Sequence, residues 1–124
     1  YGEVDIALDT FPYSGGATTC ESLWMGVPVV ALAGTGGFAR TSASFLLELG
    51  LADLVAQSGR EYISLAVNLS KNPGRIATYR RNLRPMLLNS TVADPAKFVR
   101  GLEQAYKGMY ECRLEPASFS AGEA

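Results

Sequence analysis

The stretch VDIALDTFPYSGGATTCESLWMGVPVVAL, residues 4–32, begins and ends in an apolar run. The short apolar run at 4–8 is expected to form a buried strand. The run at 27–32 lacks polar–apolar alternation, which is typical of a parallel strand covered on both faces. Turn-forming residues fill the loop at 10–17, and a helix is expected from about Thr19 to Met25. This order of strand, helix and strand predicts an α/β fold with a parallel sheet.

The same order continues along the next part of the chain. A glycine-rich loop at 33–39 precedes a second expected helix at 40–49, and a weaker strand is expected at 51–55. We therefore expect about three parallel strands flanked by helices. Because a compact domain rarely opens with its core strand at the terminus, we also expect further sequence upstream.

Helix-start signals dominate the second half of the chain. Ser58 and Glu61 match the S-x-x-E capping box, and Asn72 precedes a proline that suits the first position of another helix. Pro85 is expected to end or kink that helix. A last helix is expected from Asp94 onward. Its apolar residues at helical spacing share one face: Phe98, Leu102, Ala105, Tyr106 and Met109.

Composition excludes several classes of function. Apolar residues make up 48% of the 124 residues and the net charge is −1, so nothing indicates a nucleic-acid partner. No run of about 18 apolar residues is present, so no membrane span is expected. Histidine is absent, which excludes a histidine base and the usual metal sites within this chain. The two cysteines match no metal spacing and are expected to be reduced thiols of a cytoplasmic protein.

The loop before the first expected helix has two interpretations. Gly15 and Gly16 let the backbone approach a ligand, and Thr18 and Thr19 lie where free N–H groups and the helix dipole favour a phosphate. Glu21 follows one turn later, where its carboxylate is placed to accept bonds from ribose hydroxyls. The same T-x-x-E spacing is a capping box, which stabilises a helix by about 1 kcal/mol without any ligand. Spacing alone leaves both interpretations open.

Other side chains near this loop have competing interpretations as well. Tyr13 is placed either to contact a base or sugar or to pack within the loop. Trp24, the single tryptophan, is expected to pack in the core against the sheet. Arg40 is either a solvated side chain or a partner for an anion. The basic cluster of the long helix is expected to be a solvated face: Arg80, Arg81 and Arg84.

The run LDTFPYSGGATTCESLWMGVPVVALAG, residues 8–34, resembles the C-terminal catalytic lobe of the O-linked N-acetylglucosamine transferase family, to which SPINDLY is related. The similarity continues through ARTSASFLLELGLADLVAQSGREY at 39–62 and FVRGLEQAYKGMY at 98–110. It covers about residues 4–112 and is greatest toward bacterial members that carry tetratricopeptide repeats. The resemblance implies a glycosyltransferase of the GT-B fold, in which two Rossmann-like lobes hold a nucleotide-sugar donor between them.

This resemblance implies a division of the chain and a set of site residues. Residues 1–112 are expected to be the second half of the donor-binding lobe, and 113–124 a disordered tail. Family members hold the UDP phosphates with the glycine and threonine loop, and they bind the ribose with a carboxylate. The candidate donor-binding residues are Tyr13, Gly15, Gly16, Ala17, Thr18, Thr19, Glu21 and Arg40.

The resemblance also implies what this chain lacks. The family's catalytic histidine, its diphosphate-binding lysine and its uracil contacts lie upstream, so the chain is expected to be inactive alone and to contain no catalytic residue. No cofactor or metal is expected, because the UDP-sugar is a substrate. The sugar is expected to be N-acetylglucosamine and the acceptor a protein serine or threonine, selected by upstream repeats.

Two departures from the family pattern motivate an alternative function. The family often has histidine at the position of Gly16 and threonine at that of Ala17, so this chain has lost two side-chain donors and keeps backbone N–H groups. The alternative is a degenerate lobe that serves as a scaffold or interaction module. A flavodoxin-like or receiver-like domain is a third interpretation, supported only by Asp9. A half-sheet with an open edge is also expected to self-associate, which light scattering would reveal.

Overall fold

Three short parallel strands form the sheet of this protein, in the order β1-β2-β3. They are β1 at Ala7–Leu8, β2 at Val29–Leu32 and β3 at Val55–Ala56. The computed structural model describes residues 1–114, so the expected tail lies outside the described residues except for its first two positions, which are helical. The expected α/β fold with about three parallel strands is confirmed.

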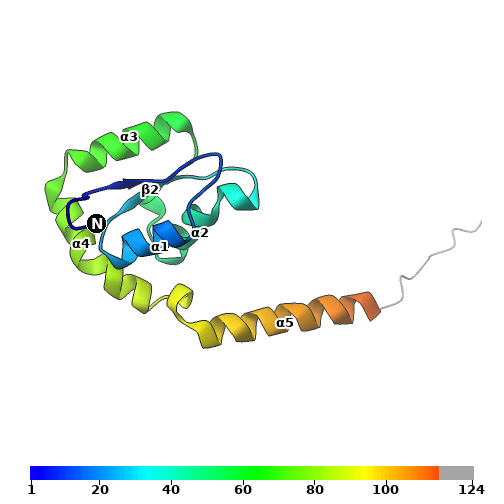
Figure 1. Cartoon of the computed structure of the whole chain (residues 1–124). Coiled ribbons are helices and arrows are strands. Elements are labelled where there is room, and N and C mark those ends of the chain that lie inside the picture. Colours follow the sequence, from blue (N-terminus) through cyan, green and yellow to red (C-terminus); the bar gives the residue numbers. More distant parts are fainter. Residues whose placement is uncertain (115–124) are drawn as a thin grey trace, which may run out of the picture.

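Helices cover both faces of the sheet (Figure 1). Helices α1 (Ala17–Trp24) and α2 (Thr41–Glu48) lie against one face, and α3 (Gly59–Ser70) covers the other. Helix α4 (Pro73–Leu88) runs along the side of this sandwich and contacts α1 and α3. Both faces of β2 are therefore buried, which explains why its sequence is apolar without alternation.

The core lies where the helices meet the sheet. Its largest fully buried side chains come from every layer: Leu23, Val27, Val30, Leu46, Leu54, Leu69 and Leu83. Each such side chain contributes about 1.5–3 kcal/mol through burial. Gly26 allows α1 and α4 to approach, because it has φ +78° and an added Cβ would lie 2.6 Å from the carbonyl oxygen of Arg80.

The starts of α3 and α4 follow their sequence signals. The Ser58 hydroxyl accepts a bond from the Glu61 N–H (3.2 Å), and the Asn72 amide oxygen accepts one from the Arg75 N–H (3.0 Å). Pro85 does not end its helix, however, and α4 continues to Leu88. The expected third strand was also misplaced, because η2 (Ala52–Leu54) is a 3-10 turn that leads into β3.

The interpretation of Trp24 as a core residue is wrong. Its side chain is 38% exposed, and its ring lies 4.2 Å from the guanidinium carbon of Arg84 on α4. The neighbouring Leu23 takes the position against the sheet, and one residue along a helix turns the side chain by about 100°. The basic cluster on α4 is therefore not only a solvated face, since Arg84 stacks on an aromatic ring and Arg80 bonds to the Val4 carbonyl.

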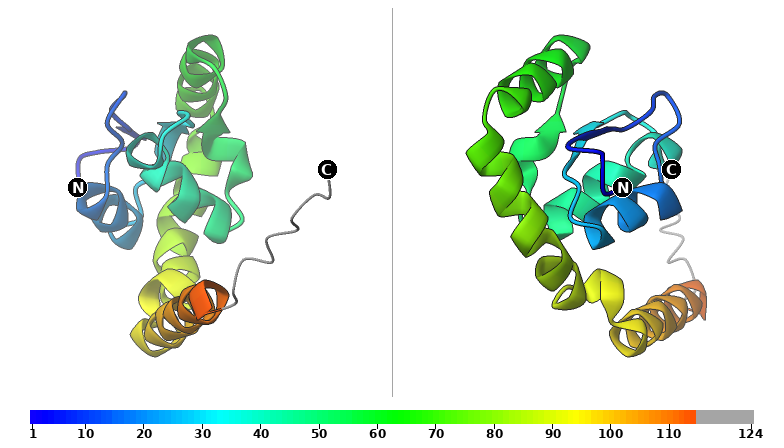
Figure 2. Two further views of the ribbon diagram at one scale, coloured as in Figure 1. Left: turned by 90° about the vertical axis from the view of Figure 1, so that its right-hand side faces the viewer. Right: turned by 60° about the vertical axis from the view of Figure 1, so that its left-hand side comes forward.

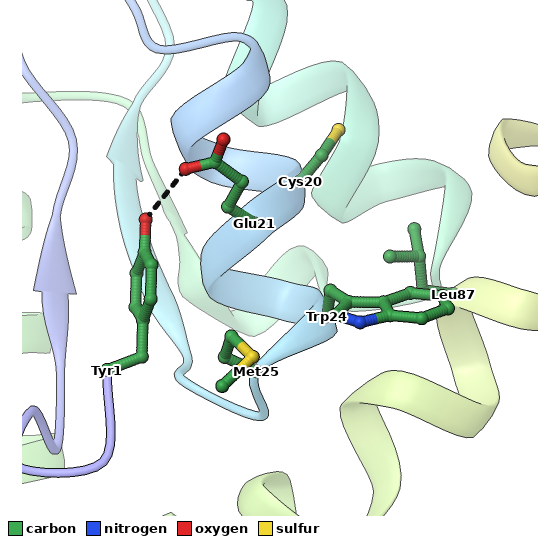
Figure 3. A pocket seen from close by; sticks show the side chains of 6 residues that line it. All are labelled: Tyr1, Cys20, Glu21, Trp24, Met25 and Leu87. Carbon is green, nitrogen blue, oxygen red and sulfur yellow. Dashed lines mark hydrogen bonds between the residues drawn. The ribbon is translucent and has the colours of Figure 1, made fainter.

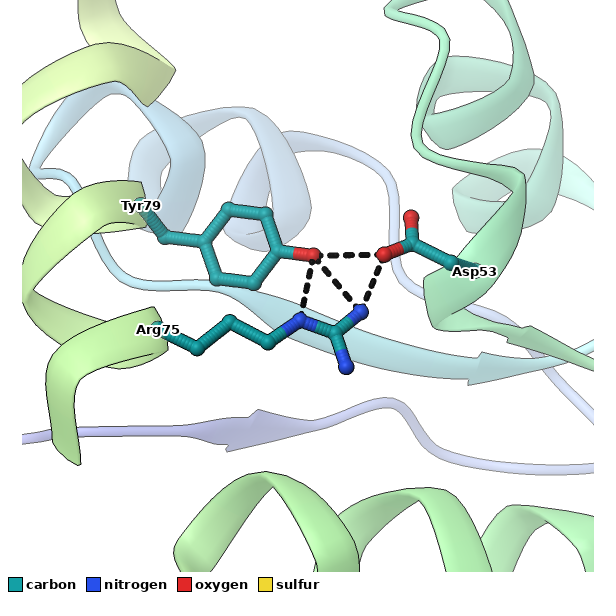
Figure 4. Close-up of polar contacts among 3 residues, drawn as sticks. All are labelled: Asp53, Arg75 and Tyr79. Atoms are coloured by element: carbon teal, nitrogen blue, oxygen red, sulfur yellow. Dashed lines mark hydrogen bonds and ion pairs between the residues drawn. The ribbon is translucent and has the colours of Figure 1, made fainter. Parts of the chain in front are cut away.

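A polar cluster joins η2 to α4 (Figure 4). The Tyr79 hydroxyl donates to the Asp53 carboxylate (2.8 Å), and the guanidinium of Arg75 contacts both groups. The pKa of Tyr79 is raised, mainly because the ring is partly buried and because its hydroxyl bonds to Asp53. Every polar group in the cluster has a partner, so we interpret it as a clamp that holds α4 beside β3.

Two further 3-10 turns are η1 (Gly37–Ala39), before α2, and η3 (Thr91–Ala93), after α4. The last helix, α5 (Pro95–Leu114), extends away from the rest of the molecule (Figures 1 and 2). The apolar face of α5 is exposed: Phe98 is 66% exposed and Met109 is 60% exposed. Self-association through the open edge of the sheet stays a prediction. No helix among residues 1–114 has the length and apolar character that a membrane span requires.

Candidate functional site

Two loops meet at the carboxyl ends of β1 and β2. The first joins β1 to α1 and the second joins β2 to α2 (Figure 1). The Ser14 N–H donates to the Phe38 carbonyl oxygen (3.0 Å), and the rings of Tyr13 and Phe38 stack with centroids 6.2 Å apart. This edge is where open parallel sheets bind their ligands.

Helix α1 begins earlier than its spacing suggested. Gly16 is the N-cap, and no side chain caps the helix, so the capping-box interpretation of Thr18 and Glu21 is wrong. The Glu21 carboxylate instead accepts a bond from the Tyr1 hydroxyl (3.1 Å), one turn inside the helix. Thr18 is already a helical residue, so its hydroxyl is not used to close the helix end.

The uncapped start leaves three backbone donors open. Within residues 1–114, no hydrogen bond uses the N–H groups of Gly16, Ala17 or Thr18. A Cβ added at Gly16 would meet no atom within 4 Å, so the surroundings of this residue are open. Unpaired N–H groups at a helix start, together with the helix dipole, form a site that favours an anion such as phosphate.

A buried polar network lies directly behind these donors. The Asp9 carboxylate accepts from the Ser14 hydroxyl (2.8 Å) and from the Gly15 N–H (2.7 Å). The Ser42 N–H donates to the Ser14 hydroxyl oxygen (2.9 Å), and the Ser42 hydroxyl donates to the Gly15 carbonyl oxygen (3.0 Å). The Thr19 hydroxyl lies 2.7 Å from that of Ser42. We call Asp9, Ser14, Thr19 and Ser42 the Asp9 network.

The Asp9 network also explains why residue 15 is a glycine. A Cβ there would lie 2.7 Å from the Thr19 hydroxyl oxygen and 3.1 Å from an Asp9 carboxylate oxygen. On the other side of Asp9, its backbone carbonyl accepts a bond from the Tyr62 hydroxyl of α3 (2.7 Å). The pKa of Tyr62 is raised, mainly by burial and further by the negative charge of Asp9.

Glu21 lies on the outward face of α1, four residues after Ala17 and therefore on the same side of the helix. It borders a largely apolar hollow of about 450 Å³ (Figure 3), which is lined by Tyr1, Cys20, Glu21, Trp24, Met25 and Leu87. Burial, and to a lesser degree the Glu21 charge, raises the pKa of the Cys20 thiol. A low thiolate fraction makes Cys20 a poor nucleophile at neutral pH.

Arg40 lies at the start of α2, and its guanidinium donates to the Gly34 carbonyl oxygen (2.8 Å). This bond closes the second loop and leaves the side chain exposed. A smaller pocket of about 110 Å³ lies between β1 and α1, next to Asp9 and Gly15. Ligand pockets usually measure about 300–1,000 Å³, so this pocket is too small for a nucleotide sugar.

The structure thus brings most of the expected site residues into one region. Tyr13, Gly15, Gly16 and Ala17 form the first loop and helix start, and Arg40 closes the adjacent loop. The hydroxyl of Thr19 is different, because it is buried and directed to Ser42. No cluster of three potential metal ligands occurs among the described residues.

Sequence reasoning missed the residues behind the loop. Asp9 was interpreted as the end of a strand and as the one residue that supports a flavodoxin-like or receiver-like domain. Ser14 was interpreted as a turn former, and Ser42 was not assigned any role. A signal was present, because the carboxyl ends of neighbouring parallel strands converge on one edge and small polar residues follow both strands. The pairing of Ser14 with Ser42 joins residues 28 positions apart, which spacing rules do not address.

Known proteins are similar to this chain in sequence. The chain is 46% identical over 110 residues to a protein of Hordeum vulgare described as a probable UDP-N-acetylglucosamine–peptide N-acetylglucosaminyltransferase SPINDLY, covering 89% of this chain and 12% of that protein. It is 30% identical over 107 residues to a UDP-N-acetylglucosamine–peptide N-acetylglucosaminyltransferase of Caenorhabditis elegans, covering 86% of this chain and 9% of that protein. The chain therefore spans only 12% and 9% of the length of these two relatives.

A solved structure is similar as well. It is a mutant of the O-GlcNAc transferase of Thermobaculum terrenum, which matches with a TM-score of 0.81 at 43% identity over 89% of this chain and 21% of that one. This likeness confirms the expectation that the strands and helices described above are part of a GT-B glycosyltransferase fold. The model of glycosyl transferase family 41 matches residues 2–102. The chain belongs to glycosyl transferase family 41.

Proposed function

We propose that this chain is the diphosphate- and ribose-binding part of a UDP-sugar-dependent protein O-glycosyltransferase. The observation that carries the proposal is the open start of α1, where the N–H groups of Gly16, Ala17 and Thr18 lack partners among residues 1–114. The chain belongs to a family whose relatives are described as UDP-N-acetylglucosamine–peptide transferases, so the diphosphate of a nucleotide sugar is the anion that fits.

Five of the candidate residues contact the donor in this proposal. The three N–H groups bind oxygens of the diphosphate, and the Thr18 hydroxyl adds a donor. Glu21 accepts bonds from the ribose hydroxyls, which requires its carboxylate to exchange the Tyr1 hydroxyl for the ribose. Tyr13 contacts the sugar or base from the exposed side of the loop, where 73% of its surface is accessible.

The proposed reaction is an inverting displacement at the anomeric carbon. The acceptor hydroxyl of a protein serine or threonine forms the new bond to that carbon, and UDP departs with the electrons of the broken bond. Donors aimed at the departing diphosphate stabilise the charge that develops in the transition state. This chain supplies such donors, and the base that removes the acceptor proton belongs to another part of the protein.

The remaining elements of the proposal concern the complete protein. We propose that it is cytoplasmic, that tetratricopeptide repeats upstream select the acceptor, and that donor binding needs no metal. We further propose that the sugar is N-acetylglucosamine, because the relatives are described as N-acetylglucosaminyltransferases. The small pocket beside Asp9 supports a shared donor site, since these residues do not enclose a nucleotide by themselves.

Calorimetry of UDP binding to the full-length protein tests this proposal. We expect wild-type protein to bind, and Glu21→Ala to lose about 1–3 kcal/mol of binding free energy, because the ribose hydroxyls would lose their acceptor. Glu48→Ala is the matched control, since Glu48 is an exposed carboxylate at the end of α2. A folded wild-type protein that does not bind UDP would instead support the scaffold function. That alternative is based on the loss of side-chain donors at Gly16 and Ala17.

A further inference from the structure

The bonds of the Asp9 network permit a single arrangement of protons. The Ser14 hydroxyl donates to Asp9, so its oxygen accepts from the Ser42 N–H. The Ser42 hydroxyl donates its one proton to the Gly15 carbonyl, and Thr19 must therefore be the donor in the bond between the two hydroxyls. All of these donors and acceptors are matched, and no buried side-chain nitrogen or oxygen among the described residues lacks a partner.

This arrangement fixes Gly15 at both of its peptide groups. Its N–H is held by Asp9 and its carbonyl by Ser42, while Thr19 fills the space that a Cβ would need. At the next residue, Gly16, an added Cβ would meet no atom within 4 Å, and the N–H is unpaired within residues 1–114. The boundary between the fixed and the open backbone therefore lies between residues 15 and 16, directly before the three free N–H groups.

The network also joins the two loops of the site. Ser42 is the second residue of α2. The loop that Arg40 closes leads directly into the start of this helix. Ser42 holds the loop before α1 in two ways, because its backbone N–H donates to the Ser14 hydroxyl and its own hydroxyl donates to the Gly15 carbonyl. The members are buried, with exposures of 8% for Asp9, 4% for Ser14, 3% for Thr19 and 0% for Ser42. Buried and fully matched networks rigidify their surroundings.

We propose that Asp9, Ser14, Thr19 and Ser42 are positioning residues for the donor diphosphate, an inference that rests on the proposed function. None of them contacts the donor in this account. They hold the backbone at Gly15 so that the N–H groups of the next three residues point together toward the diphosphate. Donors fixed in advance need no reorganisation when the ligand binds, which is the origin of the affinity.

The consequence is selective for the phosphates. Loss of a network hydroxyl should weaken binding of UDP, whose diphosphate contacts the loop, and leave binding of uridine unchanged, because uridine carries no phosphate. A role restricted to folding would lower the stability of the protein and would affect the folded protein's affinity for both ligands equally or for neither.

The test uses full-length protein, with UDP measured by calorimetry and uridine by competition against UDP. We expect Ser42→Ala to raise the Kd for UDP about tenfold, the effect of about one lost hydrogen bond. The matched control is Ser44→Ala, two residues along the same helix, where the hydroxyl bonds to a backbone carbonyl on the exposed side. This control should bind UDP as wild type does, and thermal unfolding verifies that each variant is folded.

A second pair of variants separates the hydroxyl from its volume. Thr19→Val keeps the shape of the side chain and removes the donor, whereas Thr19→Ser keeps the donor. We expect Thr19→Val to lose UDP affinity and Thr19→Ser to retain it. Unchanged UDP affinity in folded Ser42→Ala and Thr19→Val would overturn the positioning role, as would an equal loss for uridine. A folded wild type that binds no UDP would overturn the proposed function itself, and the positioning role with it.

Discussion

Helices α1 and α3 contain the same local signal at their starts, and only α3 uses it. Ser58 and Glu61 cap α3, and the Glu61 carboxylate reaches back to the Gln57 N–H (2.7 Å). The equally spaced Thr18 and Glu21 lie inside α1, which starts at an uncapped Gly16. The difference is what surrounds each start. The one at α3 is exposed, whereas the one at α1 follows a loop held by buried side chains from two elements.

This comparison shows how a helix start can remain open. A side-chain cap at α1 would satisfy the N–H groups that the proposed function needs for phosphate. Tertiary bonds to Asp9 and Ser42 stabilise the loop instead, so that the helix end does not depend on a cap. The loop before α1 can therefore be stable although the N–H groups at the helix start have no hydrogen-bond partner.

The largest effect on stability is expected when the tertiary bonds that support the start of α1 are removed. Asp9→Ala would leave the Ser14 hydroxyl and the Gly15 N–H without their buried acceptor, and we expect it to lower the free energy of unfolding by about 3 kcal/mol. Urea unfolding of the protein measures this loss. Asp5→Ala is the control, because Asp5 is an exposed partner of Arg80 and should cost less than about 0.5 kcal/mol. A loss below about 1 kcal/mol for Asp9→Ala would show that the loop is held by other contacts.

The next effect compares the two helix starts directly. Ser58→Ala removes a cap that the structure shows, and we expect a loss of about 1 kcal/mol in the free energy of unfolding. Thr18→Ala removes a residue at the same position of the same sequence pattern, and we expect a change within about 0.5 kcal/mol, because its hydroxyl caps nothing. The same urea titration compares them, and equal losses would contradict the assigned start of α1.

The smallest effect concerns the bond that links α3 to the loop before α1. The pKa of Tyr62 is raised, mainly by burial, so the folded protein retains the hydroxyl proton at a pH where the unfolded chain loses it. Its contribution is therefore complete below about pH 10 and lost as pH rises through the folded pKa. We expect the urea concentration at the unfolding midpoint to decrease as the pH is raised from about 9 to about 11. This decrease should be less steep in Tyr62→Phe.

The raised pKa values of Tyr79 and Cys20 act in the same direction, so the slope in Tyr62→Phe should be reduced and not abolished. Tyr106→Phe is the control, because this tyrosine is exposed on α5. An identical alkaline slope in wild type and Tyr62→Phe would show that burial and the Asp9 charge do not raise the pKa of the Tyr62 hydroxyl on folding.

The elements that were predicted correctly from the sequence are those whose causes lie within a few residues of one another. Continuous apolar runs identified β2, the S-x-x-E spacing identified the start of α3, and Asn72 with the following proline identified the start of α4. The glycine loop was placed correctly at the carboxyl end of β1, because strand, loop and helix follow each other along the chain. The family resemblance rested on the same contiguous stretch and is confirmed.

Features that depend on contacts between distant residues became visible in the folded structure and could not be predicted from local sequence patterns. Trp24 is outside the core because α4 offers it Arg84, and α1 starts at residue 17 because Ser42 and Asp9 hold the preceding loop. Helix α4 continues past Pro85, although proline removes one backbone donor, and Leu83 and Leu87 on either side of it are buried in the core. Local patterns express interactions within about one helical turn, whereas Ser42 lies 23 positions from Thr19 and Arg84 lies 60 positions from Trp24.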